Sequence, residues 1–163
     1  MKTLLILLAL TATAHADGDA ITTQPLALVA RGVNVGYERA VAPRLSIAGS
    51  AAYRSAAEGD YDSSTWTIGG DLRYWPRAAL HGCYVGLHAS AGRTAVTDTL
   101  MHADLGTSLE ITERVEVGWR FTIEQHFAIT PSLGVGMHHD VAHGLATITS
   151  PSIALGLELG WLF

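Results

Sequence analysis

An alternation with a period of two residues runs through most of this chain, and it constrains the fold more than any other feature. In residues 45–54 the odd positions are apolar and the even positions are polar or small, and the pattern returns in residues 65–74, 115–124, 127–138 and 153–163. Because successive side chains of a β-strand point to opposite faces, each segment predicts a strand with one apolar and one polar face. Residues 33–37 and 83–91 fit less cleanly, since Tyr84 falls on the otherwise polar face.

Composition excludes several classes of protein. The 163 residues suit one domain, and a charged fraction of only 15% argues against intrinsic disorder. The net charge is −5 and Lys2 is the only lysine, so no basic surface is available for nucleic acid. Cys83 is the only cysteine, which excludes an intramolecular disulfide and a cysteine-rich zinc module.

The first sixteen residues have the character of a cleavable export signal. Lys2 precedes an apolar run over residues 4–10, and Ala14 and Ala16 place small residues where a signal peptidase cleaves. A membrane anchor is the alternative, but the run is about half of the ~20 residues that a spanning helix needs. We therefore expect a signal peptide over residues 1–16 and a barrel domain over residues 17–163.

The connections between the predicted strands alternate in length. Short ones fall at residues 41–43, 76–81 and 124–126, and long polar ones at residues 55–63, 93–112 and 139–150. This organisation is typical of an all-β, up-and-down antiparallel transmembrane barrel. The chain enters and leaves an up-and-down barrel on the same side only if the number of strands is even. Counting strand directions back from the C-terminus therefore requires a first strand within residues 20–29, despite Pro25, and gives eight strands. Residues 93–112 could extend the flanking strands or contain another hairpin, and in the second case ten strands are possible.

The polar face carries charges in the middle of strands, which suits the narrow interior of a barrel better than a face washed by water. Aromatic residues on the apolar face lie mostly near strand ends, where interfacial belts form. We therefore expect the apolar face to contact outer-membrane lipid; a soluble β-sandwich or lipocalin-like barrel is the alternative. The expected lumen charges are Glu38, Arg54, Asp71, Arg73, His88, Glu116, Arg120, Glu124 and Glu158. We interpret them as a structural plug of mutually paired charges, with a gated ion path as the alternative.

The last predicted strand, residues 152–163, has apolar residues at alternate positions and finishes on Phe163. It resembles the terminal signature of bacterial outer-membrane barrels, and the segments 36–46 and 71–77 are similar to those of small outer-membrane barrel proteins, including the outer-membrane-protein-A-like group. The resemblance implies that Leu157, Leu159, Trp161 and Phe163 form a signal for the barrel assembly machinery.

A group of polar residues at the start of the last predicted outer loop is the best candidate for chemistry. His138, His139, Asp140 and His143 are possible metal ligands. His138, His139 and Asp140, with Ser150 and Ser152, are the only set suited to a rim enzyme acting on lipid. We expect neither role, and we assign no catalytic residue, metal site or cofactor. The sequence predicts a non-catalytic outer-membrane barrel of a Gram-negative bacterium with a structural or surface-interaction role. A narrow, porin-like pore for small solutes is the alternative, and the ligand of the outer loops is left open.

Overall fold

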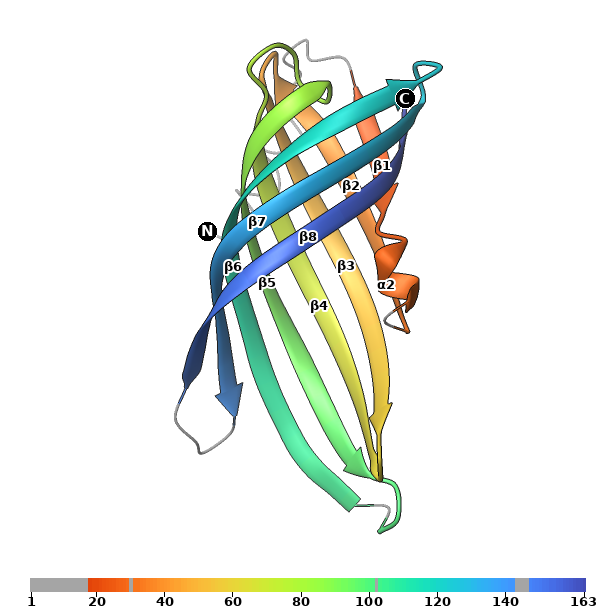
Figure 1. Ribbon diagram of the computed structural model, residues 1–163, viewed down its shortest axis with the longest axis vertical. Coiled ribbons are helices and arrows are strands. Elements are labelled where there is room, and N and C mark those ends of the chain that lie inside the picture. The colour runs from red at the N-terminus through yellow and green to blue at the C-terminus, as the bar shows by residue number, and fades with distance from the viewer. Residues whose placement is uncertain (1–17, 30, 102, 143–146) are drawn as a thin grey trace, which may run out of the picture.

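The computed structural model describes residues 18–29, 31–101, 103–142 and 147–163. Within these residues eight antiparallel strands form one closed barrel, in which each strand pairs with its neighbours in sequence and β8 pairs with β1 (Figure 1). The strands are β1 (Asp19–Thr23), β2 (Gly32–Ala42), β3 (Leu45–Glu58), β4 (Tyr61–Tyr74), β5 (Gly82–Asp98), β6 (Ala103–Ile123), β7 (Phe127–Ala142) and β8 (Ile148–Leu162). The eight-stranded, up-and-down prediction is therefore confirmed. The predicted signal peptide, residues 1–16, lies outside the described residues.

The barrel has two ends that differ in their connections. Asp19 and Phe163 lie at one end, where their backbones exchange two hydrogen bonds of 3.0 Å, together with the turns after β2, β4 and β6. We call this the terminal end and the opposite one the distal end. Figure 1 places the C-terminus and these turns at the top and the distal end at the bottom.

The strands extend much further toward the distal end than the alternation indicates. Of the segment 93–112, expected to be mainly loop, residues 93–98 belong to β5 and residues 103–112 to β6. These strands stay paired up to Asp98 and Ala103, and the described residues of the segment form no extra hairpin. Residues 55–63 likewise close as a two-residue hairpin between Glu58 and Tyr61. Gly59 has a φ of 60°, the positive value that glycine adopts at the first central position of such a turn.

The first strand is shorter than expected. The prediction of a strand within residues 20–29 is correct for β1, but residues 26–29 form a single helical turn, α2 (Leu26–Val29). Pro25 lacks the N–H that a further ladder bond needs, and its fixed φ suits the first turn of a helix. Pro25 O accepts a hydrogen bond from Leu28 N at 3.1 Å, so the proline starts the turn. Among the described residues no helix has the length and apolar character to cross a membrane.

The apolar face of the sheet points outward. Val117, Leu133 and Leu155 are 49%, 46% and 80% exposed. Residues at the alternate positions of each strand, which we call those of inward parity, point into the barrel, and polar ones such as Glu116 and Thr130 are almost completely buried. The small apolar core lies inside the barrel near the terminal end and consists of Ala20, Ala40, Trp75, Leu80, Tyr84, Ala128 and Leu162. A polar interior combined with an apolar exterior is the arrangement typical of transmembrane β-barrels.

Candidate functional site

Charged side chains from four strands meet inside the terminal half of the barrel. They are Glu38 of β2, Arg73 of β4, Glu116 and Arg120 of β6, and Glu158 of β8, each at most 8% exposed. We call these five residues the charge cluster. Their strands alternate around the barrel, so side chains that are up to 85 positions apart in sequence come within hydrogen-bond distance.

Glu38 is the anion shared by both arginines of the charge cluster. Its Oε2 lies 3.0 Å from Arg73 Nη1 and 2.7 Å from Arg120 Nη2. Its Oε1 accepts a 2.5 Å hydrogen bond from the Ser46 hydroxyl, which in turn accepts one of 2.8 Å from the indole N–H of Trp75. Both carboxylate oxygens are therefore satisfied, which is the condition for burying a charge at tolerable cost.

Arg73 connects the remaining carboxylates of the charge cluster. Its guanidinium donates to Glu158 through Nη2 at 2.7 Å and Nη1 at 3.1 Å, a two-bond geometry that fixes both side chains. Arg73 Nη2 also lies 3.5 Å from Glu116 Oε1, which accepts a hydrogen bond of 3.1 Å from Tyr84. The guanidinium carbon stands 4.9 Å from the centre of the Tyr84 ring, in cation–π contact.

An apolar lid closes the barrel on the terminal side of the charge cluster. Trp75, Leu80 and Tyr84 are at most 2% exposed, and the two aromatic rings lie 4.8 Å apart. Arg120 places its guanidinium carbon 5.1 Å from the Trp75 ring. This lid was not predicted from the sequence, although Trp75 shares the inward parity of Arg73. The turn that holds Leu80, with its φ of 66°, carries no alternation that would have revealed it.

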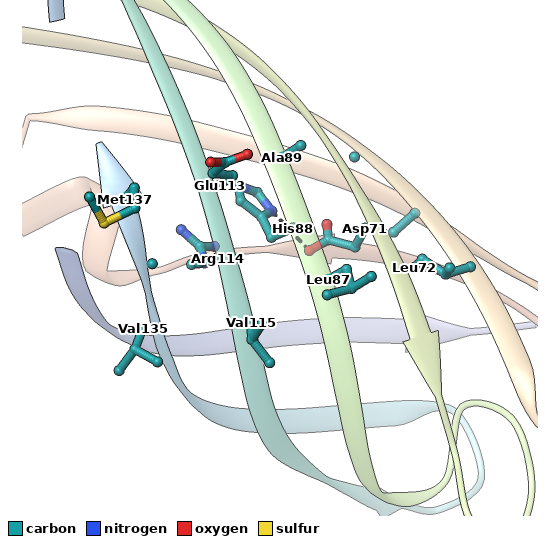
Figure 2. Close-up of a pocket in the computed structure, with 13 residues that line it drawn as sticks. Asp71, Leu72, Leu87, His88, Ala89, Glu113, Arg114, Val115, Val135 and Met137 are labelled. Atoms are coloured by element: carbon teal, nitrogen blue, oxygen red, sulfur yellow. Dashed lines mark hydrogen bonds and ion pairs between the residues drawn. The ribbon is translucent and has the colours of Figure 1, made fainter. Parts of the chain in front are cut away.

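Asp71 and His88 form the next polar layer, toward the distal end. Asp71 Oδ1 and His88 Nδ1 are 2.9 Å apart, and Asp71 is also 3.9 Å from Arg73 Nη2, which joins the pair to the charge cluster. Figure 2 shows this pair beside Arg114, which sequence reasoning did not single out. Arg114 Nε lies 3.6 Å from Glu116 Oε2. Asp71, His88 and Arg114 border a pocket of about 660 Å³ whose lining also includes outward-facing Leu87 and Val115.

Two residues expected among the lumen charges do not join this group. Glu124 is exposed in the turn between β6 and β7, with a φ of 51°, because the strand ends one residue earlier than the alternation suggested. Arg54 has the inward parity, but it lies in the distal half, where it lines a separate cavity and is exposed. The structure thus brings seven of the nine predicted residues together, namely Glu38, Asp71, Arg73, His88, Glu116, Arg120 and Glu158.

The histidine-rich segment lies in a strand, not in the loop where it was expected. His138, His139 and Asp140 belong to β7 and pair with Ser150, Thr149 and Ile148 of β8. Alternation points His138 and Asp140 inward, with 3.2 Å between Nε2 and Oδ1, and turns His139 outward, 3.7 Å from Glu113. His143 lies outside the described residues. Across the described ranges no three His, Cys, Asp or Glu side chains gather as a metal site.

The four residues of the proposed assembly signal share the outward face at the end of β8. Leu159 and Trp161 pair with Thr23 and Ile21 of β1, and Leu157 pairs with Pro131 of β7. Phe163 follows the strand and is 59% exposed. Their side chains are accessible from outside the barrel, and the same segment closes its wall.

Comparisons with known proteins agree with this geometry. No curated protein matches the sequence. Among solved structures, the N-terminal β-barrel domain of OprF from Pseudomonas aeruginosa has 10% identity and a TM-score of 0.52, over 90% of this chain and 98% of that one. A major outer membrane protein from Thermus thermophilus has 11% identity and a TM-score of 0.54, over 91% and 100%. At such identities the likeness shows the fold alone, an eight-stranded up-and-down barrel. The family described as "Protein of unknown function (DUF3575)" matches residues 2–148, so the chain belongs to the DUF3575 family.

Proposed function

We propose that the protein is a non-catalytic barrel of a Gram-negative outer membrane, closed inside by the charge cluster and exposing its distal half at the cell surface. Its role is then structural or one of surface interaction. The observation that carries the proposal is the outward apolar belt. In β7 this belt runs over residues 127–137, which matches the ~9–11 residues of a tilted strand that spans a bilayer.

Aromatic residues support the placement of the belt in a membrane. Tyr74, Trp119 and Trp161 lie on the outward face near the terminal end. On the distal side of the belt the rings of Tyr53 and Trp66 are in tilted contact, with their centroids 4.6 Å apart. Rings with a polar edge favour the two interfaces of a bilayer. Beyond Trp66, the outward positions of β4 become polar at Ser64 and Asp62, where the strand would leave the lipid.

The interior favours a closed barrel over the alternative of a narrow pore. The Arg120 side chain is completely buried and contacts Glu38 on one side and Thr130 on the other, at 2.7 and 3.0 Å. The pocket bordered by Arg73 and Glu158 of the charge cluster and by Asp71 and His88 has a volume of about 20 Å³, room for about one water molecule. Conduction would require these ion pairs to separate.

A rim enzyme has less support. Its candidate base, His138, bonds Thr112 at 2.9 Å and pairs with Asp140, while outward-facing His139 cannot reach the same substrate. We therefore propose no catalytic role. By the same placement, the partners of the chain are outer-membrane lipid and the barrel assembly machinery, which would recognise Leu157, Leu159, Trp161 and Phe163.

Two measurements test the proposal. After expression, the chain is expected in the outer-membrane fraction and should migrate differently on SDS gels before and after boiling, since a closed barrel resists the detergent until heated. Recovery in the soluble periplasmic extract, with no heat-dependent shift, would contradict the membrane placement. In planar bilayers the closed interior predicts no steady single-channel conductance, and regular conductance steps would favour the pore instead.

A further inference from the structure

The wall of the barrel is closed between β1 and β8 over a short distance only. Their ladder joins Ala20–Thr23 to Leu159–Leu162, after which β1 gives way to Pro25 and α2. On this side of β8, residues 148–158 have no strand partner within the described chain. We call this opening between α2 and β8 the seam. Figure 1 shows β8 crossing the front of the barrel, with β3 to β5 visible beyond its open edge.

The seam exposes apolar side chains more than the rest of the belt does. Ile153 and Leu155 on β8 are 79% and 80% exposed, compared with 46% for Leu133 on the neighbouring strand β7. On the other margin, Leu28 and Val29 of α2 are 67% and 85% exposed. Pro151 also lies on the open edge, a position where a strand tolerates proline. Both margins of the seam are therefore suited to acyl chains.

The unpaired edge has a consequence for the interior. In hydrocarbon an unpaired backbone group costs several kcal/mol, and irregular backbone at membrane depth is tolerated only where it is buried in protein or lines a water-filled cavity. A cavity of about 380 Å³ lies inside the barrel next to the α2 margin of the seam, lined by Ala27 and Gly32 at that margin and by Ser50 and Thr67 inside. Its volume is within the ~300–1,000 Å³ range of small-molecule sites.

The charges of this cavity favour an anion. Its lining includes two arginines, one histidine and one carboxylate: Arg54, Arg114, His88 and Glu110. Glu110 accepts a hydrogen bond from Thr94, and His88 is paired with Asp71. Arg114 Nε is buried without a hydrogen bond, and Arg54 has no ion pair with any described residue. Two arginines, Arg54 and Arg114, therefore line the cavity against the single carboxylate of Glu110. Arg114 is also partly neutralised by Glu116, which leaves Arg54 as the cation without an ion pair in the described part of the chain.

From this juxtaposition we propose that the seam is a lateral entrance for a single-chain anionic amphiphile, such as a long-chain carboxylate. The carboxylate binds in the cavity at Arg54, with Arg114 nearby, and the alkyl chain leaves through the seam, along α2 and Leu155. The charge cluster closes the terminal side of the cavity and so prevents passage through the barrel. This inference rests on the membrane placement proposed above, because the alkyl chain must continue into lipid.

The test is binding of dansyl-labelled undecanoic acid to the full chain in phosphatidylcholine nanodiscs, compared with empty nanodiscs. We expect a saturable increase in dansyl fluorescence that oleate displaces and that dodecyltrimethylammonium, with a cationic head, does not. Arg54→Gln should weaken binding about tenfold or more, because a charge-assisted hydrogen bond contributes about 1.5–3 kcal/mol. Arg77→Gln, in the exposed turn at the terminal end, is the matched control and should bind as the wild type does.

A second pair of variants tests the cavity itself. Ala52→Trp fills the cavity from the inward face of β3, and Ala51→Trp adds the same ring to the outward face one residue away. Loss of binding in Ala52→Trp alone supports the site. Equal binding in the two variants, or no signal above empty nanodiscs, overturns it.

Two further readouts separate the possible failures. Heat-dependent migration of each variant reports insertion independently, so a barrel that inserts and binds no probe overturns the amphiphile site and leaves the proposed function intact. A wild-type chain that never inserts overturns the proposed function itself. Dimers linked edge to edge through β8, without probe binding, would assign the seam to a second copy of the chain and also overturn the proposal.

Discussion

At the scale of single residues, Glu38 is the side chain on which the interior depends most. It accepts hydrogen bonds from Ser46 and from both arginines of the charge cluster. Glu38→Ala leaves Arg73 and Arg120 buried with less compensation, and removing one partner of a buried ion pair costs about 3–5 kcal/mol. Urea unfolding of the inserted barrel should show this loss. Glu124→Ala, at the exposed turn, should stay within about 0.5 kcal/mol of wild type, and equal losses would contradict the placement of these two carboxylates.

Gly118 is a second residue with a specific requirement, set by the lid. A Cβ at position 118 would lie 2.5 Å from the Tyr84 ring, which is buried against Trp75 and cannot move away freely. Gly118→Ala should therefore destabilise the barrel by about 1–3 kcal/mol, the usual cost of overpacking. Combined with Tyr84→Leu, which removes the ring, the same substitution should cost much less. A double-mutant cycle in denaturant measures this coupling, and simple additivity would show that the ring is not the obstacle.

The alternation of side chains along each strand predicts which charged residues point into the barrel, but not where each of them lies between its two ends. Glu38, Arg73 and Glu158 were assigned to the lumen from alternation, and the structure places them in one cluster. Arg54 has the same parity, yet it lies in the distal cavity, because depth depends on strand register across the barrel, which one strand's sequence does not contain. Aromatic Tyr84 looked like an exception to the pattern and is part of the lid.

At the scale of elements, β1 is the weakest strand in sequence and the one on which closure of the barrel depends. Ile21 pairs with Tyr37 on one side and with Trp161 on the other. Ile21→Pro removes one backbone donor and disturbs a closing ladder that spans only Ala20–Thr23. We expect this variant to lose heat-dependent migration and to be degraded in cells.

The control for this prediction is Thr149→Pro, near the start of β8. Phe163 exchanges hydrogen bonds with Asp19 of β1, so the odd positions of β8 direct their N–H groups toward the β1 side, where residue 149 has no strand partner within the described chain. This variant should insert normally. Normal insertion of Ile21→Pro would show that the β1–β8 ladder is not needed for closure.

The ends of the elements were the part of the fold that the sequence could not predict. Alternation marks a strand only where its two faces meet different surroundings, as in residues 45–54. Toward the distal end both faces meet water, so residues 55–58 continue β3 without an apolar side. Pro25 was treated as tolerable near a strand start, whereas it ends β1 and begins α2. The short strand produces the seam, which no periodicity in the sequence indicated.

At the scale of the whole molecule, the orientation of the sheet determines how the barrel tolerates new charge. Leu157 faces outward in the middle of the apolar belt of β8, between Leu155 and Leu159. Leu157→Arg would place a guanidinium in hydrocarbon and should cost up to about 2–4 kcal/mol near the bilayer midplane.

Ser50 lies on the inward face of β3 and lines the distal cavity, so Ser50→Arg adds the same charge where water can solvate it. Reversible unfolding of both variants in phosphatidylcholine vesicles should therefore show a large loss for Leu157→Arg and a small one for Ser50→Arg. In a soluble barrel with the same fold the outward guanidinium would contact water, and Leu157→Arg would no longer lower the free energy of unfolding by this amount. The difference between the two variants thus measures what surrounds the belt, and a difference near zero would place the protein outside the membrane.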